Sequence, residues 1–366
     1  MSGPEPAPLA IDSVLASGHN GDHFRDPDHP EKMNGHKETP VDYLLFGNGW
    51  IASQVKQLLL EQGKVVATSF ARLEHREDVM RDLKRYAPRR VMNFAGVRGL
   101  PNADWCEDHK VETARSNILG VMNLVDCCYL LDIHITHFGS ACIYEHDANH
   151  PPDHHFTEDD EPFYHASFYS HTRLVSEWAI RHYPNLLLLR VRAPIAANLD
   201  PNNLLTKLFN YKRILNIPAS GTVLPDLLPG AILLAEHGET GVYNLISPQP
   251  FTNNEILSLA KKYVHPSLTW ENFELEDQKA VLKAPRCNPV FDTTKLVNKL
   301  RELGYQVKDT HEALEDMFIK MGEQLARVAS FGGLSSEEAL LALTTRERAI
   351  GPRPAEQVNG SPIATR

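Results

Sequence analysis

The sequence has no apolar run that approaches the roughly 20 residues a membrane-spanning helix needs. The N-terminus lacks an apolar signal core, and its acidic residues disfavour an organellar transit peptide. Positive charge is also scarce: the 366 residues carry a net charge of −10, whereas phosphate binding favours a basic surface. These absences predict a cytoplasmic protein whose partners include neither a membrane nor a nucleic acid.

Cysteine is scarce as well. The five cysteines are an odd number without regular spacing, which is typical of free thiols in a reducing compartment rather than of a disulfide framework. Histidines and aspartates gather between residues 146 and 155, but this proline-containing stretch has no fixed ligand spacing. The sequence therefore predicts no metal site.

Short apolar runs alternate with amphipathic stretches of helical length along the first half of the chain. Strands that alternate with helices imply a parallel sheet covered on both faces. The apolar runs lie at residues 43–46, 65–70, 91–95, 133–139 and 186–191. The pattern predicts an α/β fold built on a Rossmann-like, doubly wound parallel sheet.

A glycine turn, Gly47-Asn-Gly-Trp-Ile-Ala52, follows the first run and precedes a helical stretch at residues 54–60. In such a turn the first glycine permits the bend, the second lets N–H groups approach a pyrophosphate, and a small third residue allows close packing. The N-terminus of the helix then favours the phosphate charge. We expect a dinucleotide to contact the following residues of this turn: Gly47, Asn48, Gly49, Trp50 and Ile51.

The second run ends at Thr68-Ser-Phe70 without the acid that usually accepts the adenosine ribose 2′-hydroxyl. Arg72 and Leu73 follow instead, and an arginine there favours a 2′-phosphate, hence NADP(H), with NAD(H) as the alternative. A solvated surface arginine is the other interpretation of Arg72. The third run ends in Asn93-Phe-Ala-Gly96, where Asn93, Ala95 and Gly96 either pass close to the cofactor or form a purely structural strand end.

After Pro194 the sequence indicates helices, short loops and one further strand near residues 242–245, which fits a smaller C-terminal domain that binds the substrate. The expected organisation has four segments. They are a disordered tail at 1–40, an NAD(P)-binding Rossmann domain at 41–195, a substrate-binding domain at 196–328, and a peripheral helix with a flexible tail at 329–366.

The segment Tyr169-Ser-His-Thr-Arg173 combines a tyrosine with a cation four residues later. Many dehydrogenases pair a tyrosine and a lysine at this spacing, and the lysine holds the ribose and lowers the pKa of the tyrosine. Arg173 keeps the charge, but its planar guanidinium is not equivalent to an ammonium at a positioned site. The segment predicts nicotinamide chemistry with one part altered.

Several longer stretches are distinctive. They are Pro101-Asn-Ala-Asp-Trp-Cys-Glu-Asp-His-Lys110, Cys142-Ile-Tyr-Glu-His-Asp147, Leu189-Arg-Val-Arg-Ala-Pro194, Leu224-Pro-Asp-Leu-Leu-Pro229 and Ala284-Pro-Arg-Cys-Asn288. With the glycine turn and Phe168-Tyr-Ser170, they resemble the extended short-chain dehydrogenase/reductase superfamily. More closely, residues 43–325 resemble the bifunctional nucleotide-rhamnose synthase/epimerase-reductases of plants and fungi.

Members of that family take UDP- or dTDP-4-keto-6-deoxyglucose, invert C3 and C5, and reduce C4 to give the L-rhamnose nucleotide. The resemblance implies that Cys142 and Lys207 exchange the protons at C3 and C5, with base and acid not assigned between them. It further implies Tyr169 as the proton donor for C4, with Arg173 beside it and Ser140 orienting the ketone. The expected contacts with the nucleotide sugar are Arg98, Asn102, Arg192, Pro194, Arg286 and Asn288.

The chain departs from the family pattern at the parts that serve hydride transfer. Arg173 replaces the lysine, the glycine turn is one residue shorter, and Phe138-Gly-Ser-Ala-Cys142 replaces the usual Ala-Thr-Gly-Cys. A second interpretation therefore stays open, namely a catalytically weakened NAD(P)-binding partner subunit that resembles the β-subunit of methionine adenosyltransferase. In either case a homodimer is compatible with the sequence.

Overall fold

The computed structural model describes residues 40–99, 102–274, 283, 285–332 and 340. The chain divides into two units, Met1–Glu38 and Thr39–Arg366, and every described residue belongs to the second. Of the expected tail at 1–40, only Pro40 is among the described residues. Of the expected peripheral helix and tail at 329–366, only residues 329–332 and Leu340 are among them. Within the described part of the chain, no helix combines the length and apolar character that crossing a membrane requires.

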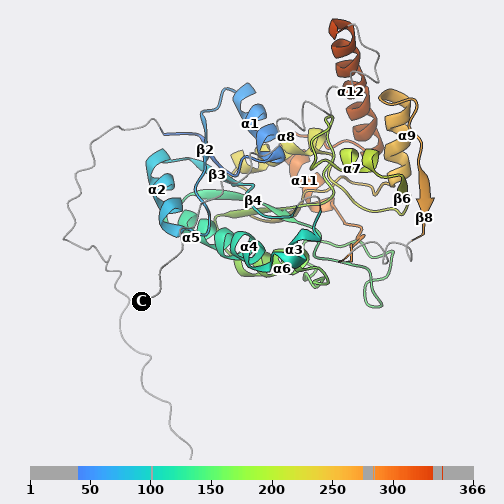
Figure 1. Cartoon of the computed structure of the whole chain (residues 1–366). Helices are drawn as coiled ribbons and strands as arrows, with labels where there is room; N and C mark the ends of the chain where they lie inside the picture. The colour runs from blue at the N-terminus through green and yellow to red at the C-terminus, as the bar shows by residue number, and fades with distance from the viewer. Residues whose placement is uncertain (1–39, 100–101, 275–282, 284, 333–339, 341–366) are drawn as a thin grey trace, which may run out of the picture. The chain divides into compact units, whose positions relative to one another are not determined.

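A parallel sheet of six strands forms the centre of this unit, in the order β2-β1-β3-β4-β5-β7 (Figure 1). The order reverses between β1 and β3, which creates the crevice at the carboxyl ends of the strands where ligands bind in doubly wound sheets. The strands are β1 (Tyr43–Phe46), β2 (Val66–Ser69), β3 (Arg90–Asn93), β4 (His134–Ser140), β5 (Leu186–Val191) and β7 (Gly241–Asn244).

The two faces of the sheet bury different side chains because successive residues of a strand point to opposite sides. Tyr43 and Leu45 of β1 pack in one hydrophobic cluster, whereas Leu44 and Phe46 pack in another. The first cluster includes residues of α1 (Trp50–Glu61), α8 (Leu224–Glu236) and α11 (Thr294–Glu302). The second includes residues of α2 (Arg76–Tyr86), α5 (Val121–Leu130) and α6 (Phe168–Ile180). Helices therefore cover both faces, as Figure 1 shows.

Three short helical segments lead from β3 to α5. They are α3 (Trp105–Asp108), α4 (Lys110–Ala114) and the π-helix η1 (Arg115–Gly120). Residue Gly120 lies where this segment meets the loop after β2, since a Cβ there would come 2.7 Å from Leu73 Cβ. This close approach requires a residue without a side chain.

A third hydrophobic cluster lies in the C-terminal part of the described chain. Its members include Leu205, Leu257 and Phe318, which are fully buried and come from three different helices. The elements here are α7 (Leu204–Asn210), β6 (Arg213–Leu215), α9 (Asn253–Tyr263), β8 (Glu271–Phe273) and α12 (Thr310–Gly332). Strands β6 and β8 pair in parallel as a separate two-stranded sheet.

The fold expected from the sequence is confirmed, and every expected strand exists within one or two residues at each end. One placement needs correction. The strand expected near residues 242–245 is β7, and it pairs with β5 in the main sheet rather than standing in the C-terminal part. Its partner lies about 50 residues earlier in the chain, and such a pairing has no local signal in the sequence.

Candidate active site

The glycine turn begins where β1 ends and brings the backbone against the end of β3. Gly47 has φ of +90°, and a Cβ there would come 2.8 Å from the nitrogen of Ala95. Gly49 immediately precedes α1, and a Cβ built on it would meet nothing within 4 Å. Open space therefore lies in front of the N-terminus of α1, where helix N–H groups favour a phosphate.

That space opens into a pocket of about 860 Å³ at the carboxyl ends of the strands. Its lining includes residues from β4, α6 and α7, so the pocket lies between the parts of the chain before and after Pro194. The expected site residues that line it are Gly49, Trp50, Ile51, Ala95, Gly96, Arg98, Asn102, Ser140, Cys142, Tyr169, Arg173, Arg192, Pro194, Lys207, Arg286 and Asn288.

Five expected cofactor residues do not line the pocket: Gly47, Asn48, Arg72, Leu73 and Asn93. Asn93 is fully buried, where its amide oxygen accepts from the nitrogen of Ala95 at 2.9 Å. The side chain of Arg72 is 73% exposed and forms an ion pair with Glu74 at 2.7 Å. Asn93 thus shapes the strand end, while Arg72 lies at the surface close to the end of β2.

Cys142 lies two residues beyond β4, and its backbone nitrogen donates to the hydroxyl of Ser140 at 3.2 Å. The pKa of its thiol is lowered to about 6. The largest cause is a hydrogen bond from the side chain of Cys287, which outweighs the opposing effect of burial. Arg192, Ser140 and Arg173 lower the pKa further. Cys142 is therefore poised to be a thiolate near neutral pH.

Cys287 is buried beside Cys142, and its own pKa is raised well above the usual value by the hydrogen bond to Cys142 and by burial. Arg192 holds this segment, because one end of its guanidinium donates to the carbonyl of Cys287 at 2.6 Å and the other to that of Ser220 at 2.5 Å. The backbone nitrogen of Asn288 donates to Glu145 at 3.2 Å. No motif in the sequence indicated a role for Cys287, although it lies between two residues, Arg286 and Asn288, that were expected to bind substrate.

Lys207 lies in the last turn of α7, whose start is capped by Asn203 accepting from the nitrogen of Leu205 at 3.1 Å. Its pKa is lowered to about 8, chiefly by burial and then by the positive charge of Arg98, whereas Cys142 opposes the shift. Arg98 itself donates to the side chain of Asn202. Lys207 therefore faces the same pocket as Cys142 and can gain or lose a proton close to neutral pH.

Tyr169 and Arg173 both face the pocket from α6. The guanidinium carbon of Arg173 lies 6.0 Å from the centre of the Tyr169 ring, and Nη2 donates to the carbonyl of Phe138 at 3.0 Å. A Cβ on Gly96 would come 3.0 Å from Nη1 of Arg173. Glycine at 96 therefore leaves room for the guanidinium between the ends of β3 and β4.

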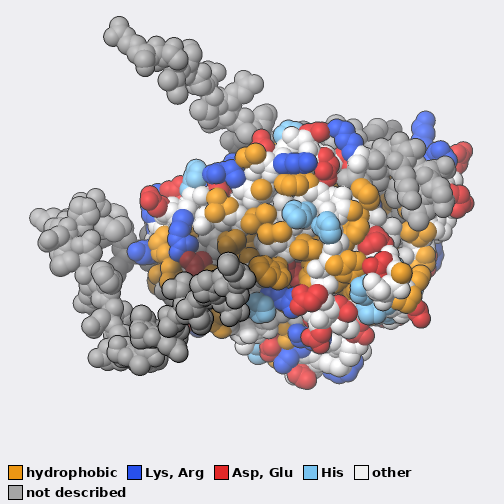
Figure 2. Space-filling view, turned by 90° about the horizontal axis from the view of Figure 1, so that it is seen from below, with side chains coloured by type: hydrophobic (Ala, Val, Ile, Leu, Met, Phe, Trp, Pro, Cys, Tyr) orange, Lys and Arg blue, Asp and Glu red, His pale blue; other side chains and the backbone are white. Residues whose placement is uncertain are grey.

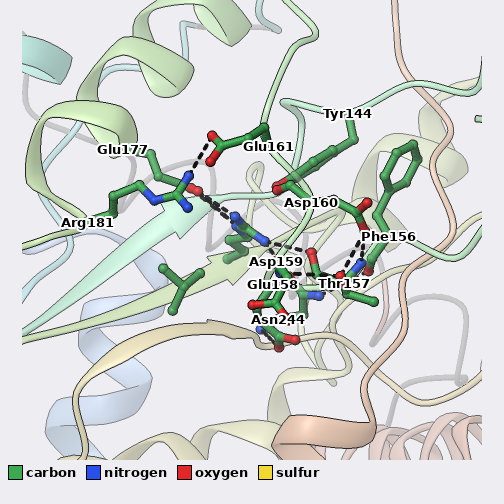
Figure 3. Close-up of polar contacts among 12 residues, drawn as sticks. Tyr144, Phe156, Thr157, Glu158, Asp159, Asp160, Glu161, Glu177, Arg181 and Asn244 are labelled. Atoms are coloured by element: carbon green, nitrogen blue, oxygen red, sulfur yellow. Dashed lines mark hydrogen bonds and ion pairs between the residues drawn. The ribbon is translucent and has the colours of Figure 1, made fainter. Parts of the chain in front are cut away.

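Helix α6 is held at its start and along its buried face. The carboxylate of Glu107 accepts from the nitrogen of Phe168 at 2.6 Å, where the positive end of the helix favours an acid. Further along, Glu177 forms a fully buried ion pair with Arg190 of β5 at 2.6 Å. Arg190 also donates to the amide oxygen of Asn244 in β7 at 3.2 Å. Figure 3 labels Glu177 and Asn244, the partners of this arginine in α6 and β7. These contacts fix the helix that carries Tyr169.

The loop after β3 is held by Asn117, for which no sequence motif indicated a role either. Asn117 is fully buried in the π-helix η1. Its amide oxygen accepts from the nitrogen of Val97, and its amide nitrogen donates to the carbonyl of Val97, each at 2.7 Å. Both backbone groups of Val97 are thereby satisfied by one side chain. An isolated asparagine within a helix of mixed composition gives little sequence signal for such a role.

Comparison with known proteins agrees with this architecture. Residues 45–199 match the model of the NAD dependent epimerase/dehydratase family. The bifunctional dTDP-4-dehydrorhamnose 3,5-epimerase/dTDP-4-dehydrorhamnose reductase of Arabidopsis thaliana is 39% identical over 274 residues, which are 74% of this chain and 91% of that protein.

Two solved structures are also similar. The L780 UDP-rhamnose synthase of Acanthamoeba polyphaga mimivirus has a TM-score of 0.71 and 34% identity, covering 77% of this chain and all of that one. The dTDP-4-dehydrorhamnose reductase of Bacillus anthracis, solved in complex with NADP, has a TM-score of 0.65 at 15% identity over 77% of this chain and all of that one. The second likeness shows the fold alone.

The sheet, the glycine turn and the family model together define an enzyme of the NAD dependent epimerase/dehydratase class. Within that class, the family follows from the sequence identity to the plant and viral proteins and from the share of each of those proteins that this chain covers. The chain belongs to the family of nucleotide-rhamnose synthases and epimerase/reductases.

Proposed function

We propose that this chain converts UDP- or dTDP-4-keto-6-deoxyglucose to the L-rhamnose nucleotide, by epimerisation at C3 and C5 followed by reduction at C4. One observation supports this proposal above the others. Cys142 and Lys207 face one pocket, and their pKa values are lowered to about 6 and about 8, so both can exchange protons near neutral pH.

The chemistry of the substrate explains why such a pair is useful. Both C3 and C5 lie next to the C4 ketone, so removing a proton from either gives an enolate whose charge spreads onto oxygen. Inversion requires one group to remove the proton and another to return one on the opposite face. In this proposal Cys142 and Lys207 are the two groups, and Ser140 lies close enough to Cys142 to orient the ketone.

We assign cofactor binding to residues 41–195 and substrate binding to residues 196–328. The open space before Gly49 and the N-terminus of α1 fit a dinucleotide pyrophosphate. NADP(H) is the proposed cofactor, with NAD(H) as the alternative, because Arg72 follows β2 where an acid would favour NAD(H). When bound, the reduced nicotinamide supplies the hydride for C4, and Tyr169 gives its proton to the C4 oxygen.

The expected substrate contacts fall into three sets. Arg192 is committed to the carbonyls of Ser220 and Cys287, so we assign it to positioning the thiol pair rather than to the sugar. Arg286 pairs with Asp104 at 2.7 Å and also donates to Asn102, which places a charged network at the pocket wall. The remaining proposed contacts with the nucleotide sugar are Arg98, Pro194 and Asn288, which also line the pocket.

A homodimer is part of the proposal. Figure 2 shows hydrophobic side chains gathered on the face that carries α4, α5 and α6. Val111 of α4 and Trp178 of α6 are 69% and 67% exposed, and Leu119 of η1 and Met122 of α5 are 41% and 42% exposed. Exposed apolar side chains that gather on one face are typical of subunit contacts. Light scattering of the wild type and of Trp178→Glu should show a dimer and a monomer, respectively.

One observation favours the alternative of a partner subunit. The guanidinium of Arg173 is committed to the carbonyl of Phe138 and lies against Gly96, so it is held rather than free to grip a ribose. A protein with that arrangement could bind the dinucleotide and have lost the reduction.

Incubation with each 4-keto-6-deoxyglucose nucleotide and NADPH in D₂O separates these possibilities. Deuterium at C3 and C5 reports epimerisation, and loss of NADPH absorbance reports reduction. We expect both with at least one of the two nucleotides. Deuterium exchange without NADPH oxidation would leave only the epimerase. Absence of both signals, together with NADPH binding, would favour the partner subunit.

A further inference from the structure

Two thiols of this chain meet in the pocket, although they are 145 residues apart in sequence. Cys142 follows β4, and Cys287 belongs to the segment between β8 and α11; both line the pocket. Their side chains are hydrogen-bonded to each other, and both cysteines are free. The Cys142 thiol is therefore open to small molecules in the pocket, and Cys287 is buried beside it.

The other three cysteines lie in a different environment. Cys106, Cys127 and Cys128 are buried, do not line the pocket, and have pKa values raised by burial. A thiol in apolar surroundings is inert, whereas a thiolate beside cationic groups is nucleophilic. Cys142 has Arg192 and Arg173 near it and a pKa lowered to about 6, so it is the reactive member of the five.

We propose that Cys142 and Cys287 form an oxidation site in which hydroperoxides convert the thiol pair to an intramolecular disulfide. In the first step the Cys142 thiolate attacks the peroxide O–O bond, which leaves a sulfenic acid on Cys142 and, with hydrogen peroxide, a hydroxide ion. In the second step the Cys287 sulfur attacks the sulfenic sulfur, the S–O bond breaks, and the oxygen and the Cys287 proton leave as water. The peroxide is reduced and the two thiols are oxidised by two electrons.

The structure favours Cys287 as the second thiol because its segment is tied to the segment that follows Cys142. The nitrogen of Asn288 donates to Glu145 at 3.2 Å, and the nitrogen of Val290 donates to His146 at 3.3 Å. Arg192 holds the carbonyl of Cys287 at 2.6 Å. The two sulfurs thus remain neighbours without a search through other conformations, and the second step is intramolecular.

The consequence for activity rests on the proposed function, whereas the thiol chemistry does not. A disulfide removes the Cys142 thiolate and with it the proposed proton transfer at C3 and C5. Positioned proton transfer contributes about 10²–10⁴-fold, so exchange should fall by about a hundredfold or more. A dithiol reductant should restore it, because the disulfide can be exchanged back to thiols.

The test uses the full, reduced chain titrated with hydrogen peroxide, blocked with N-ethylmaleimide and mapped by mass spectrometry. We expect a peptide pair linked through Cys142 and Cys287 within one chain, while Cys106, Cys127 and Cys128 carry the maleimide. In parallel, deuterium exchange at C3 and C5 is measured before oxidation, after oxidation and after dithiothreitol. Exchange should fall with the appearance of the disulfide and return when it is reduced.

Two variants make the test specific. In Cys287→Ser the serine hydroxyl still donates to the thiolate but cannot form a disulfide, so Cys142 should proceed to sulfinic or sulfonic acid and dithiothreitol should fail to restore exchange. Cys106→Ser is the matched control, since it removes a buried cysteine with a polar neighbour, Thr113. Its response to peroxide should equal that of the wild type.

Three results overturn the proposal: over-oxidation of Cys142 in the wild type without a disulfide, a disulfide between two chains, or no oxidation of either cysteine at a tenfold excess of peroxide, a level that low-pKa thiols react with readily. Failure of the proposed function gives a different result. The linked peptides would then appear although the reduced chain exchanges no deuterium.

Discussion

The pocket carries two sets of residues, which we call the proton end (Cys142 and Lys207) and the hydride end (Tyr169 and Arg173). The two sets are neighbours, since Arg173 also lowers the pKa of Cys142. At one end Cys142 and Lys207 have pKa values lowered to about 6 and about 8, so their charges can change near neutral pH. At the other end the guanidinium of Arg173 donates to the carbonyl of Phe138 and packs against Gly96. In the proposed function, proton exchange and hydride transfer depend on different residues, and single substitutions should separate them.

The physical causes also differ between the ends. Burial favours the neutral form of Lys207, and a thiol donor together with arginines favours the anionic form of Cys142. Neither effect requires a new hydrogen bond to the substrate. At the hydride end, by contrast, function depends on where a rigid guanidinium lies, and errors of position of about 1 Å can cost about a hundredfold.

The largest expected effect is on the proton end alone. Cys142→Ser replaces a thiol that can ionise near pH 6 with a hydroxyl that does not, so deuterium exchange at C3 and C5 should fall by about 10²–10⁴-fold. Exchange is measured by NMR in D₂O with the 4-keto-6-deoxyglucose nucleotide.

The matching control uses a substrate that is already epimerised. With the 4-keto-L-rhamnose nucleotide and NADPH, Cys142→Ser should oxidise the cofactor at a rate within about threefold of the wild type. The reason is that we do not expect the substitution to weaken binding of the nucleotide sugar. A large loss with this substrate as well would mean that the two ends are not independent.

The next effect concerns the anchor of α6, which carries both Tyr169 and Arg173. Glu177→Gln leaves Arg190 buried without an opposite charge on its nearest partner, and breaking a buried pair costs about 3–5 kcal/mol. The free energy of unfolding, measured in urea, should fall by about this amount. Reduction should also fall more than exchange, because Cys142 and Lys207 are not carried by this helix.

Glu161, labelled in Figure 3, offers a matched control variant. Glu161 pairs with Arg181 at 2.8 Å, but its side chain is 70% exposed, and such pairs contribute about 0–1 kcal/mol. Glu161→Gln should therefore leave stability almost unchanged. Equal losses of unfolding free energy in Glu177→Gln and Glu161→Gln would show that burying the Glu177–Arg190 pair does not raise its contribution to stability.

Arg173→Lys is expected to have a smaller and opposite effect. An ammonium keeps the charge without the planar fork, so it can leave the carbonyl of Phe138 and reach the ribose hydroxyls. C4 reduction, followed by NADPH absorbance, should rise by about ten- to a hundredfold while exchange at C3 and C5 stays nearly unchanged. If reduction is abolished instead, Arg173 is an adapted catalytic residue.

The sequence predicted the fold more completely than the site. The runs at 43–46 and 186–191 became strands with unchanged ends, because continuous apolar strands belong to the centre of a parallel sheet. The strand β7 was expected, but its pairing with β5 was not, since nothing near Val242 records a partner about 50 residues away.

The site shows the same limit at the level of side chains. The residues of the glycine turn and of Tyr169–Arg173 could be found because they form motifs with fixed spacing. Asn117 and Cys287 could not, because each acts through a contact with a distant segment: Val97 for the first and Cys142 for the second. Spacing along the chain predicts local geometry, whereas these contacts exist only after folding.

The smallest expected effect is a shift along the pH axis that tests how the proton end is tuned. If the thiolate of Cys142 and the ammonium of Lys207 act together, exchange should be bell-shaped. It falls below about pH 6, where the thiol is protonated, and above about pH 8, where Lys207 loses its proton. If Cys142 acts as the thiol and Lys207 as the amine instead, the profile has the same shape with a lower maximum. The shape therefore tests whether the two residues act together, and not which of them is the base.

Cys287→Ala then distinguishes the two limbs. It removes the thiol that donates to Cys142, and a hydrogen bond to a charged group is worth about 1.5–3 kcal/mol, so the acidic limb should move up by about one to two pH units. The alkaline limb should move much less, because burial and Arg98 are the largest causes of the lowered pKa of Lys207 and do not change, whereas Cys142 has a smaller effect on it. A profile that is flat between pH 5 and pH 9, or a variant that moves only the alkaline limb, contradicts this tuning. In that case the lowered pKa values would not distinguish the proton end from the hydride end, and only the positions of the side chains would.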